Sequence, residues 1–302
     1  MKCSSLFTKI TAGFCLAFLL MLAGQLQAQT INTPADLYKN TGDPLQGTST
    51  NDGNTIICAN AAAFTLVSTT ADASSVPYTD WKWEELQTNG SWSTTIESGA
   101  AVTGEPHKLR MTGATPGWHV YRVTAAVSTA GCLADPVLYT VFVLPALSVE
   151  AKANKATADE LTYCAENGAP TAASTGGAIR FTATPSFATA LRAVPGSTGA
   201  GTTTTLPTLT IADFKINYAW YKVEDGGSAT GTAVGSNDDE YEVNDAATTG
   251  ATTVKKYTYR LEADYAVKAC DLKNVTAVLS GGSGTATITV TPKPGAPTIT
   301  IE

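Results

Sequence analysis

Two stretches of this chain repeat one pattern. Residues 117–132 read GWHVYRVTAAVSTAGC and residues 256–270 read KYTYRLEADYAVKAC, and in each a cysteine stands eleven residues after the tyrosine of a Tyr-Arg pair. A tryptophan stands 38 residues before the first of these tyrosines, Tyr121, and 39 residues before the second, Tyr259. Both stretches alternate in period two, the pattern of a half-buried strand. The repeat therefore predicts two copies of one β-domain.

The rest of the sequence agrees with β-structure. Thr, Ala, Gly and Ser dominate, and only 15% of residues are charged. Short runs of β-branched and aromatic residues are separated by turn signals such as Asn89-Gly90. Helical periodicity is missing from these runs. We predict an all-β protein made of two tandem Ig-like antiparallel β-sandwich domains that follow a cleaved signal peptide.

The second copy of the repeat indicates which side chains face the core. Tyr257 and Tyr259 alternate there with charged residues that begin at Lys256, so the tyrosines are expected to point inward. Carried back to the first copy, His119 and Tyr121 point inward. Trp118 takes the place of Lys256 and is predicted to point outward.

The chain opens with an export signal. Lys2 and Lys9 precede an apolar run that is too short for a stable membrane anchor, and cleavage is expected after Ala28. No second run of membrane length follows, so we predict no integral membrane segment after cleavage. The expected destination is the exterior, the cell surface or the periplasm. The predicted boundaries are a signal peptide at 1–28, an irregular lead-in at 29–45, sandwich 1 at 46–148, a linker at 149–159, sandwich 2 at 160–292 with a mobile Thr/Gly-rich insertion near 186–213, and a tail at 293–302.

The charge balance limits the partners. The whole chain has a net charge of −7, and loss of the two signal lysines makes it −9. Nucleic-acid and anionic-membrane binders need basic patches, so the sequence argues against both. A protein or a glycan at the cell surface is the expected partner.

The cysteines predict disulfides. Cys58, Cys132, Cys164 and Cys270 remain after signal cleavage, an even number in an exported chain. Two fall in each predicted domain, which favours Cys58–Cys132 and Cys164–Cys270 among the three possible pairings. Zinc is the competing use of cysteine, but it needs closely spaced pairs that the sequence lacks.

No catalytic, cofactor or metal residues are predicted. The two histidines are His107, in a loop, and His119, in a core position, and no hydrolase or phosphate-binding motif is present. The adjacent Glu84 and Glu85 point to opposite faces of their strand and cannot act as a pair. The acidic run 238–245 lacks the glycine turn of a calcium loop and is read as a solvated loop.

The tryptophans suggest an alternative function. Trp118 is predicted outward and Trp92 lies beside a turn, so the two rings could form a platform for sugars in the first domain. Trp81 and Trp83 share a strand face that we expect to point inward. A carbohydrate-binding module is therefore the second hypothesis. An enzyme with carboxylates gathered from distant strands is the third.

The order of these motifs resembles a known family. In each copy a cysteine is followed by a Trp strand, a Tyr-Arg strand (Tyr-x-Tyr-Arg-Leu in the second copy), a loop cysteine, and Thr-[Val/Ile]-x-Val before a proline. This order, over about 45–292, resembles the Ig-like or PKD-like repeats of Bacteroidota surface and secreted proteins, often adhesin-like or gliding-associated. It departs from antibody domains, whose second cysteine follows the tyrosine by two residues. The resemblance implies a non-enzymatic structural or adhesion protein.

Overall fold

The computed structural model describes residues 56–59, 63–97, 99–127, 133–198, 206–267, 273–281 and 284–298. Almost every element is a strand, and the helices in these ranges are the short 3-10 turns η3 (Ala165–Asn167) and η4 (Ile211–Asp213). Within the same ranges, no helix is long and apolar enough to cross a membrane. The predicted all-β class is confirmed.

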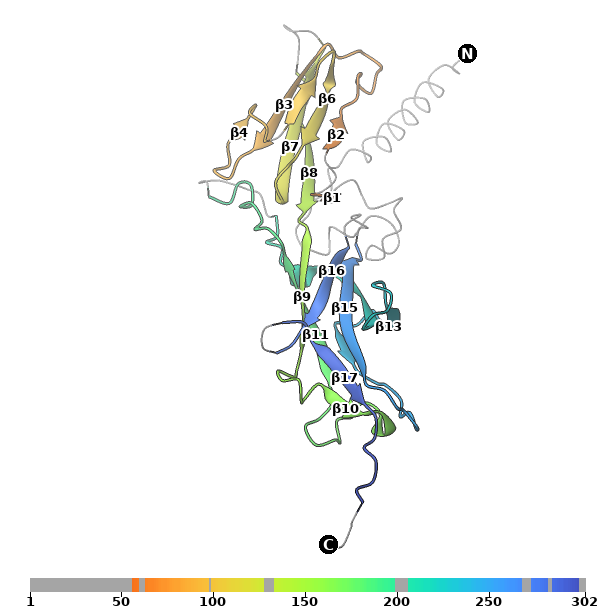
Figure 1. Ribbon diagram of the computed structural model, residues 1–302. Coiled ribbons are helices and arrows are strands. Elements are labelled where there is room, and N and C mark those ends of the chain that lie inside the picture. The colour runs from red at the N-terminus through yellow and green to blue at the C-terminus, as the bar shows by residue number, and fades with distance from the viewer. Residues whose placement is uncertain are drawn as a thin grey trace, which may run out of the picture.

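The first unit is a sandwich of two sheets (Figure 1). One sheet has the order β1-β8-β7-β3-β4 and the other β2-β6-β5. Tyr121 and Trp83 from the first sheet and Leu109 and Met111 from the second share one buried cluster. The strands are β1 (Ile56–Cys58), β2 (Ala63–Val67), β3 (Asp80–Leu86), β4 (Trp92–Ser93), β5 (Gly99–Val102), β6 (Glu105–Thr112), β7 (Gly117–Ala126) and β8 (Val137–Leu144).

The second unit repeats this plan. The parallel pair β1/β8 corresponds to β10/β17, and the antiparallel run β8-β7-β3-β4 corresponds to β17-β15-β12-β13. Here β16 joins both layers into one nine-stranded sheet. The strands are β9 (Leu147–Ala153), β10 (Thr162–Cys164), β11 (Arg180–Phe187), β12 (Ile216–Glu224), β13 (Thr232–Ser236), β14 (Glu240–Glu242), β15 (Lys255–Tyr265), β16 (Asn274–Leu279) and β17 (Thr287–Thr291).

The repeated plan is that of an Ig-like sandwich. Such folds place the strands that carry the core Trp and the late Tyr side by side in one layer. Trp220 on β12 and Tyr259 on β15 are fully buried on neighbouring strands, and Phe181 from the opposite layer lies 4.8 Å from the Tyr259 ring. We propose that the two units are the domains predicted at 46–148 and 160–292. The signal peptide and lead-in lie outside the described residues.

The two units stand end to end, and β8 leads into β9 after only Pro145 and Ala146 (Figure 1). The predicted linker at 149–159 differs from the structure, because Leu147–Ala153 forms β9 and pairs with both β11 and β16. The charged residues of this segment alternate with buried Val149 and Ala151, which is a strand pattern. The connection between the units is thus very short.

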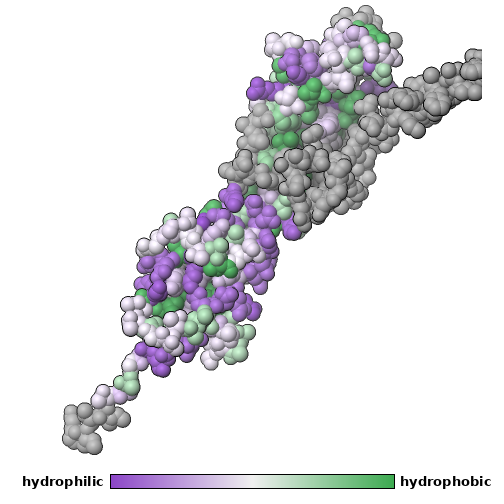
Figure 2. All heavy atoms as spheres, turned by 90° about the vertical axis from the view of Figure 1, so that its right-hand side faces the viewer, coloured by the Kyte–Doolittle hydropathy of each residue, from purple (hydrophilic) through white to green (hydrophobic). Residues whose placement is uncertain are grey.

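One hydrophobic core continues across this connection. Trp118 and Phe142 of the first unit belong to the same buried cluster as Phe214 and Tyr265 of the second. On the face of the second unit shown in Figure 2, hydrophilic and hydrophobic residues are interspersed. The two buried apolar clusters lie inside the sandwiches and at the joint between them.

Candidate functional site

The joint between the units is built around two buried polar side chains. Glu85 on β3 and His119 on β7 are both 0% exposed, and His119 Nδ1 lies 3.0 Å from Glu85 Oε1. The predicted inward orientation of His119 is confirmed. Glu84 and Glu85 point to opposite faces as expected, since Glu84 binds Arg122 at 2.6 Å on the other side of the sheet.

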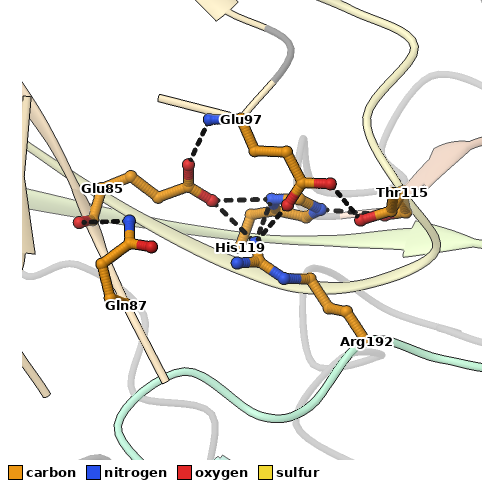
Figure 3. A network of polar contacts seen from close by, with 6 residues as sticks. All are labelled: Glu85, Gln87, Glu97, Thr115, His119 and Arg192. Atoms are coloured by element: carbon orange, nitrogen blue, oxygen red, sulfur yellow. Dashed lines mark hydrogen bonds and ion pairs between the residues drawn. The ribbon is translucent and has the colours of Figure 1, made fainter. Parts of the chain in front are cut away.

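A cation from the second unit completes this pair (Figure 3). Arg192 Nη1 donates to Glu85 Oε1 at 2.7 Å and lies 2.6 Å from His119 Nδ1. Its distance to Glu97 Oε2 is 3.4 Å. Arginine keeps its charge under all ordinary conditions. The buried carboxylate of the first unit is therefore neutralised by the second unit.

Further hydrogen bonds hold the two carboxylates and the imidazole of the network in place. The main-chain N–H of Glu97 donates to Glu85 Oε2 at 2.7 Å, and the Thr115 hydroxyl donates to Glu97 Oε1 at 2.7 Å. His119 Nε2 lies 2.9 Å from the Thr115 carbonyl oxygen, which only accepts, so Nε2 carries a proton. A neutral His119 ring accepts from Arg192 through Nδ1, and a charged ring donates to Glu85. We call Glu85, His119, Arg192, Glu97 and Thr115 the joint network.

The network sets the protonation of its carboxylate. Burial alone would raise the pKa of Glu85. Hydrogen bonds from His119, Arg192 and the Glu97 main chain outweigh burial, so the pKa of Glu85 is lowered. Glu85 is thus ionised at neutral pH although it is fully buried.

The joint network is the one place among the described residues where grouped side chains could hold a metal. Glu85, Glu97 and His119 bring possible ligand atoms within 4.8 Å of one another. The Arg192 guanidinium lies among the same atoms. A permanent cation in that position repels a metal ion and uses the lone pairs that would bind it. The arrangement fits an interdomain ion pair and not a metal centre.

Main-chain hydrogen bonds fix the same segment of the second unit to the first. The N–H of Arg192 donates to the Pro116 carbonyl at 2.8 Å, and the N–H of Gly196 donates to the Gln87 carbonyl at 2.9 Å. The N–H of Thr198 donates to the Thr88 carbonyl at 2.9 Å. Residues 186–213 were predicted to be a mobile insertion. Within its described part, Arg192, Gly196 and Thr198 are hydrogen-bonded to the first unit.

Close approach at this point requires a glycine. Gly117 has a φ of +124°, and a Cβ added there would lie 2.9 Å from Arg192 Cγ and 3.0 Å from Arg192 N. Contacts under 3.0 Å force a displacement, and positive φ favours glycine over other residues. Gly117 therefore lets the Arg192 segment lie directly on the start of β7.

The apolar half of the joint overturns the prediction for Trp118. This residue is 2% exposed, and its indole N–H donates to the Pro207 carbonyl of the second unit at 2.8 Å. Its ring lies 5.0 Å from Phe142, which stacks on Phe214 at 5.8 Å. The outward orientation was transferred from Lys256, whose face is open in the second unit. In the first unit the neighbouring unit covers that face.

Trp92 does not combine with Trp118 into the predicted sugar platform. Trp92 is half-buried, and the guanidinium of Arg122 covers its ring at 4.4 Å. A stacking platform needs exposed ring faces, and Trp118 offers none. Trp81 is half-buried and Trp83 is buried, as their shared inward face predicts.

The acidic run 238–245 is used structurally. Glu242 binds Arg180 at 2.8 Å, and Lys222 donates to Asp245 at 2.6 Å. The Tyr163 hydroxyl also donates to Asp245. These partners are side chains on other strands of the second unit.

The cysteines depart from the predicted pairing. Cys58 is disulfide-bonded, whereas Cys164 is a free thiol. Cys132 and Cys270 lie outside the described residues. Because Cys164 is a free thiol, the predicted Cys164–Cys270 bond is wrong, and the predicted Cys58–Cys132 bond stays a prediction.

Sequence reasoning placed His119 in the core and Glu85 on the opposite strand face from Glu84, but it did not bring Glu85 and His119 together and it missed Arg192. Arg192 stands in a segment whose Thr, Gly, Ala and Pro content suggests a mobile loop. A signal was nevertheless present. A buried acid and a buried histidine on neighbouring strands need a compensating partner, and few cations are available in this chain of 15% charged residues.

Comparisons with known proteins assign no family. No family model matches the sequence, and no curated protein gives a significant match. Among solved structures, the chain is similar to murine CEACAM1b, with 9% identity, a TM-score of 0.31 and coverage of 80% of this chain and 96% of that one. It is also similar to a tetra-tandem repeat in the extending region of a large adhesion protein, with 10% identity, a TM-score of 0.26 and coverage of 76% and 49%. The D00-D0 domain of intimin gives 13% identity, a TM-score of 0.25 and coverage of 75% and 96%. The fold assignment rests on the sheet topology and not on these likenesses.

Proposed function

We propose that this protein is a non-enzymatic, exported structural or adhesion protein whose two Ig-like domains form one stiff rod. The observation that carries this proposal is the joint network. A buried carboxylate in one unit forms an ion pair with an arginine from the other. Separating the units would leave Glu85 without its cation, which is costly in a buried site.

The connection supports the same role. Independent domains usually meet through polar interfaces and move relative to each other. Here two residues separate β8 from β9, and one apolar cluster contains residues of both units. A rod of this kind can hold a binding surface at a fixed distance from its attachment point. The partner we propose is a protein or a glycan at the cell surface, as the sequence suggests.

The stiffness is tested by small-angle X-ray scattering of the chain without residues 1–28. We expect one extended particle whose scattering is fitted by a single arrangement of the two units between 50 mM and 500 mM salt. The joint charges are buried, so salt should screen them little. Scattering that requires a mixture of bent and extended forms would refute the rod.

Adhesion is tested separately by displaying the chain on an inert cell or bead. Retention on surfaces coated with matrix proteins, or with glycans, would identify the class of partner. Hydrolysis of a polysaccharide or a peptide by the purified chain would overturn the non-enzymatic assignment. A rod that is stiff but retained on no surface would leave only the structural role.

A further inference from the structure

The outer edge of β8 is open along its first half. On this side β1 pairs with only Phe142–Leu144, whereas β7 lies along the other side of the strand. In a ladder, the main-chain N–H and C=O of one residue point to the same side, and successive residues alternate. The N–H of Ala59 donates to the Leu144 carbonyl on the β1 side, so Leu138 and Thr140 also present their main-chain groups there. No residue that the structure describes pairs with those groups.

This edge lacks the usual protection against strand pairing. Natural proteins protect an edge with charges, prolines, bulges or a covering segment. The stretch Val137–Val141, which we call the open edge, contains no charged residue and no proline, and its register with β7 has no bulge. Four of the eight exposed large apolar side chains among the described residues lie at the same end of the first unit: Val127, Leu133, Val137 and Leu138. An added strand would satisfy the main chain and cover apolar side chains together.

We propose that the open edge binds the open edge of a second copy of this chain, antiparallel and around a two-fold axis at Tyr139. In this register Leu138 of one copy faces Thr140 of the other, and the reverse pair is identical by symmetry. The main-chain groups of both residues point outward, so each pair exchanges N–H···O bonds in both directions. The edge is therefore complementary to itself, as a two-fold interface requires.

Charge favours a second copy at this place over most other contacts. The chain has a net charge of −7, so two copies repel each other on average. No charged residue stands between Asp135 and Glu150, and the open edge lies in this uncharged run. Two copies can thus approach there with little repulsion. A strongly acidic or basic peptide would find no opposite charge on the strand itself.

The size of the contact predicts weak association. A pair of five-residue strands buries far less than the roughly 1,200 Å² of a typical stable interface. Four main-chain hydrogen bonds and a few apolar side chains correspond to a Kd on the order of 0.1–1 mM. Single molecules in dilute solution would stay monomeric. Many copies on one surface would bind through avidity to many copies on another.

The direction of the pairing fits contact between two surfaces. Figure 1 shows β8 running along the length of the rod, from the far end of the first unit toward the joint. Antiparallel pairing would therefore overlap two first units and point the two second units in opposite directions. Rods that stand on facing surfaces by their second units would meet in this way. This inference rests on the adhesive function proposed above and names its partner as the same protein.

Association is tested by sedimentation equilibrium of the chain without residues 1–28, up to millimolar concentration. We expect a monomer–dimer equilibrium that is tighter in 500 mM than in 50 mM salt, because salt screens the repulsion between acidic copies. Leu138→Lys brings two like charges close together across the two-fold axis and should raise Kd at least tenfold. The control Val275→Lys changes a side chain that is 56% exposed on the second unit and should leave Kd unchanged.

Urea melts of both variants show whether they fold, so a loss of association in Leu138→Lys can be assigned to the edge. Equal association of Leu138→Lys and the native chain would overturn the proposal, as would a native chain that stays monomeric at 1 mM. Amide exchange gives a second readout. The amides of Leu138 and Thr140 should be protected only in concentrated samples. Protection in the dilute monomer would show that the chain covers its own edge, which also overturns the proposal.

Beads that carry the chain separate this inference from the adhesive function. We expect native beads to clump with one another and Leu138→Lys beads to stay dispersed. If native beads stay dispersed but are retained on a surface coated with matrix proteins or glycans, pairing between copies fails and adhesion stands. If sedimentation finds the β8 dimer but the beads bind neither one another nor any coated surface, the dimer stands and the adhesive function fails.

Discussion

Replacing Arg192 with methionine removes the charge at the joint and keeps most of the side-chain length. Glu85 is 0% exposed and would remain buried without its cation. Two opposite charges about 4 Å apart interact by about 4 kcal/mol when the effective dielectric constant is near 20. Removal of one partner of a buried pair typically costs about 3–5 kcal/mol. We therefore expect Arg192→Met to lower the unfolding free energy by about 3 kcal/mol.

A double-mutant cycle isolates the pair. Arg192→Met, Glu85→Gln and the double variant are unfolded in urea, with the fluorescence of joint residue Trp118 as one probe. The coupling between the two sites should be about 2–3 kcal/mol, because each single change leaves the other buried group without its partner. It should persist in 1 M salt, which screens exposed charges far more than buried ones.

The chain contains a matched control. Arg180 and Glu242 form a pair of the same chemistry at 2.8 Å, against 2.7 Å for the buried pair, but their side chains are 48% and 42% exposed. Exposed pairs contribute little and lose that little in salt. Equal coupling in the two cycles would refute the argument that burial makes the joint pair strong.

Three further predictions concern the same joint. Gly117→Ala should release the Arg192 segment because the added Cβ would meet Arg192. Gly113→Ala, also at positive φ but with nothing within 4 Å of the added Cβ, should leave the segment in place. Amide hydrogen exchange at residues 191–198 should therefore be faster in Gly117→Ala alone. The pKa of Glu85 is lowered in the folded protein, so its contribution to stability is complete above its unfolded pKa near 4.3 and is lost as the pH falls through its lower folded pKa. In urea melts at a series of pH values, Glu85→Gln should therefore lose less unfolding free energy on acidification than the native chain does. An equal loss in the two proteins would contradict the assignment. Trp118→Ala should cost about 3–5 kcal/mol as a core cavity, and half-buried Trp92→Ala much less; comparable midpoints in urea would contradict the buried position of Trp118.

The sequence predicts the interior of each sandwich well. Alternation along one strand assigns Tyr121, His119 and Tyr259 to the core, and all three are buried. The reason is that a strand in a sandwich meets its own opposite layer in every copy of the fold. The alternation of apolar and polar residues along a strand therefore predicts which side chains face the opposite layer.

The joint could not be predicted in the same way. Trp118 and Lys256 occupy equivalent strand positions, yet one is buried and the other exposed, because the second unit covers that face of the first copy. Matching residues between the two copies predicts contacts within one copy. It does not predict contacts between the copies. Counting two cysteines in each domain likewise predicted a bond between Cys164 and Cys270, and the free thiol of Cys164 contradicts it.

The last prediction concerns why the joint contains charges at all. Replacing a buried ion pair with apolar residues of similar size often keeps or raises stability, so stability alone does not explain Glu85, His119 and Arg192. Apolar side chains accept many packing arrangements, whereas a buried carboxylate is satisfied only where its donors meet it. Our hypothesis is that the joint network fixes the angle between the units.

Under this hypothesis, the triple variant Glu85→Leu, His119→Leu and Arg192→Met should unfold at least as late in urea as the variant Arg192→Met. Its small-angle scattering should nevertheless require a wider range of arrangements between the two units than the native chain does. The variant Arg180→Met serves as the control, since its exposed pair lies within the second unit. If the triple variant scatters as one rigid particle, apolar packing and the short β8–β9 connection alone determine the angle, and the charges have another role.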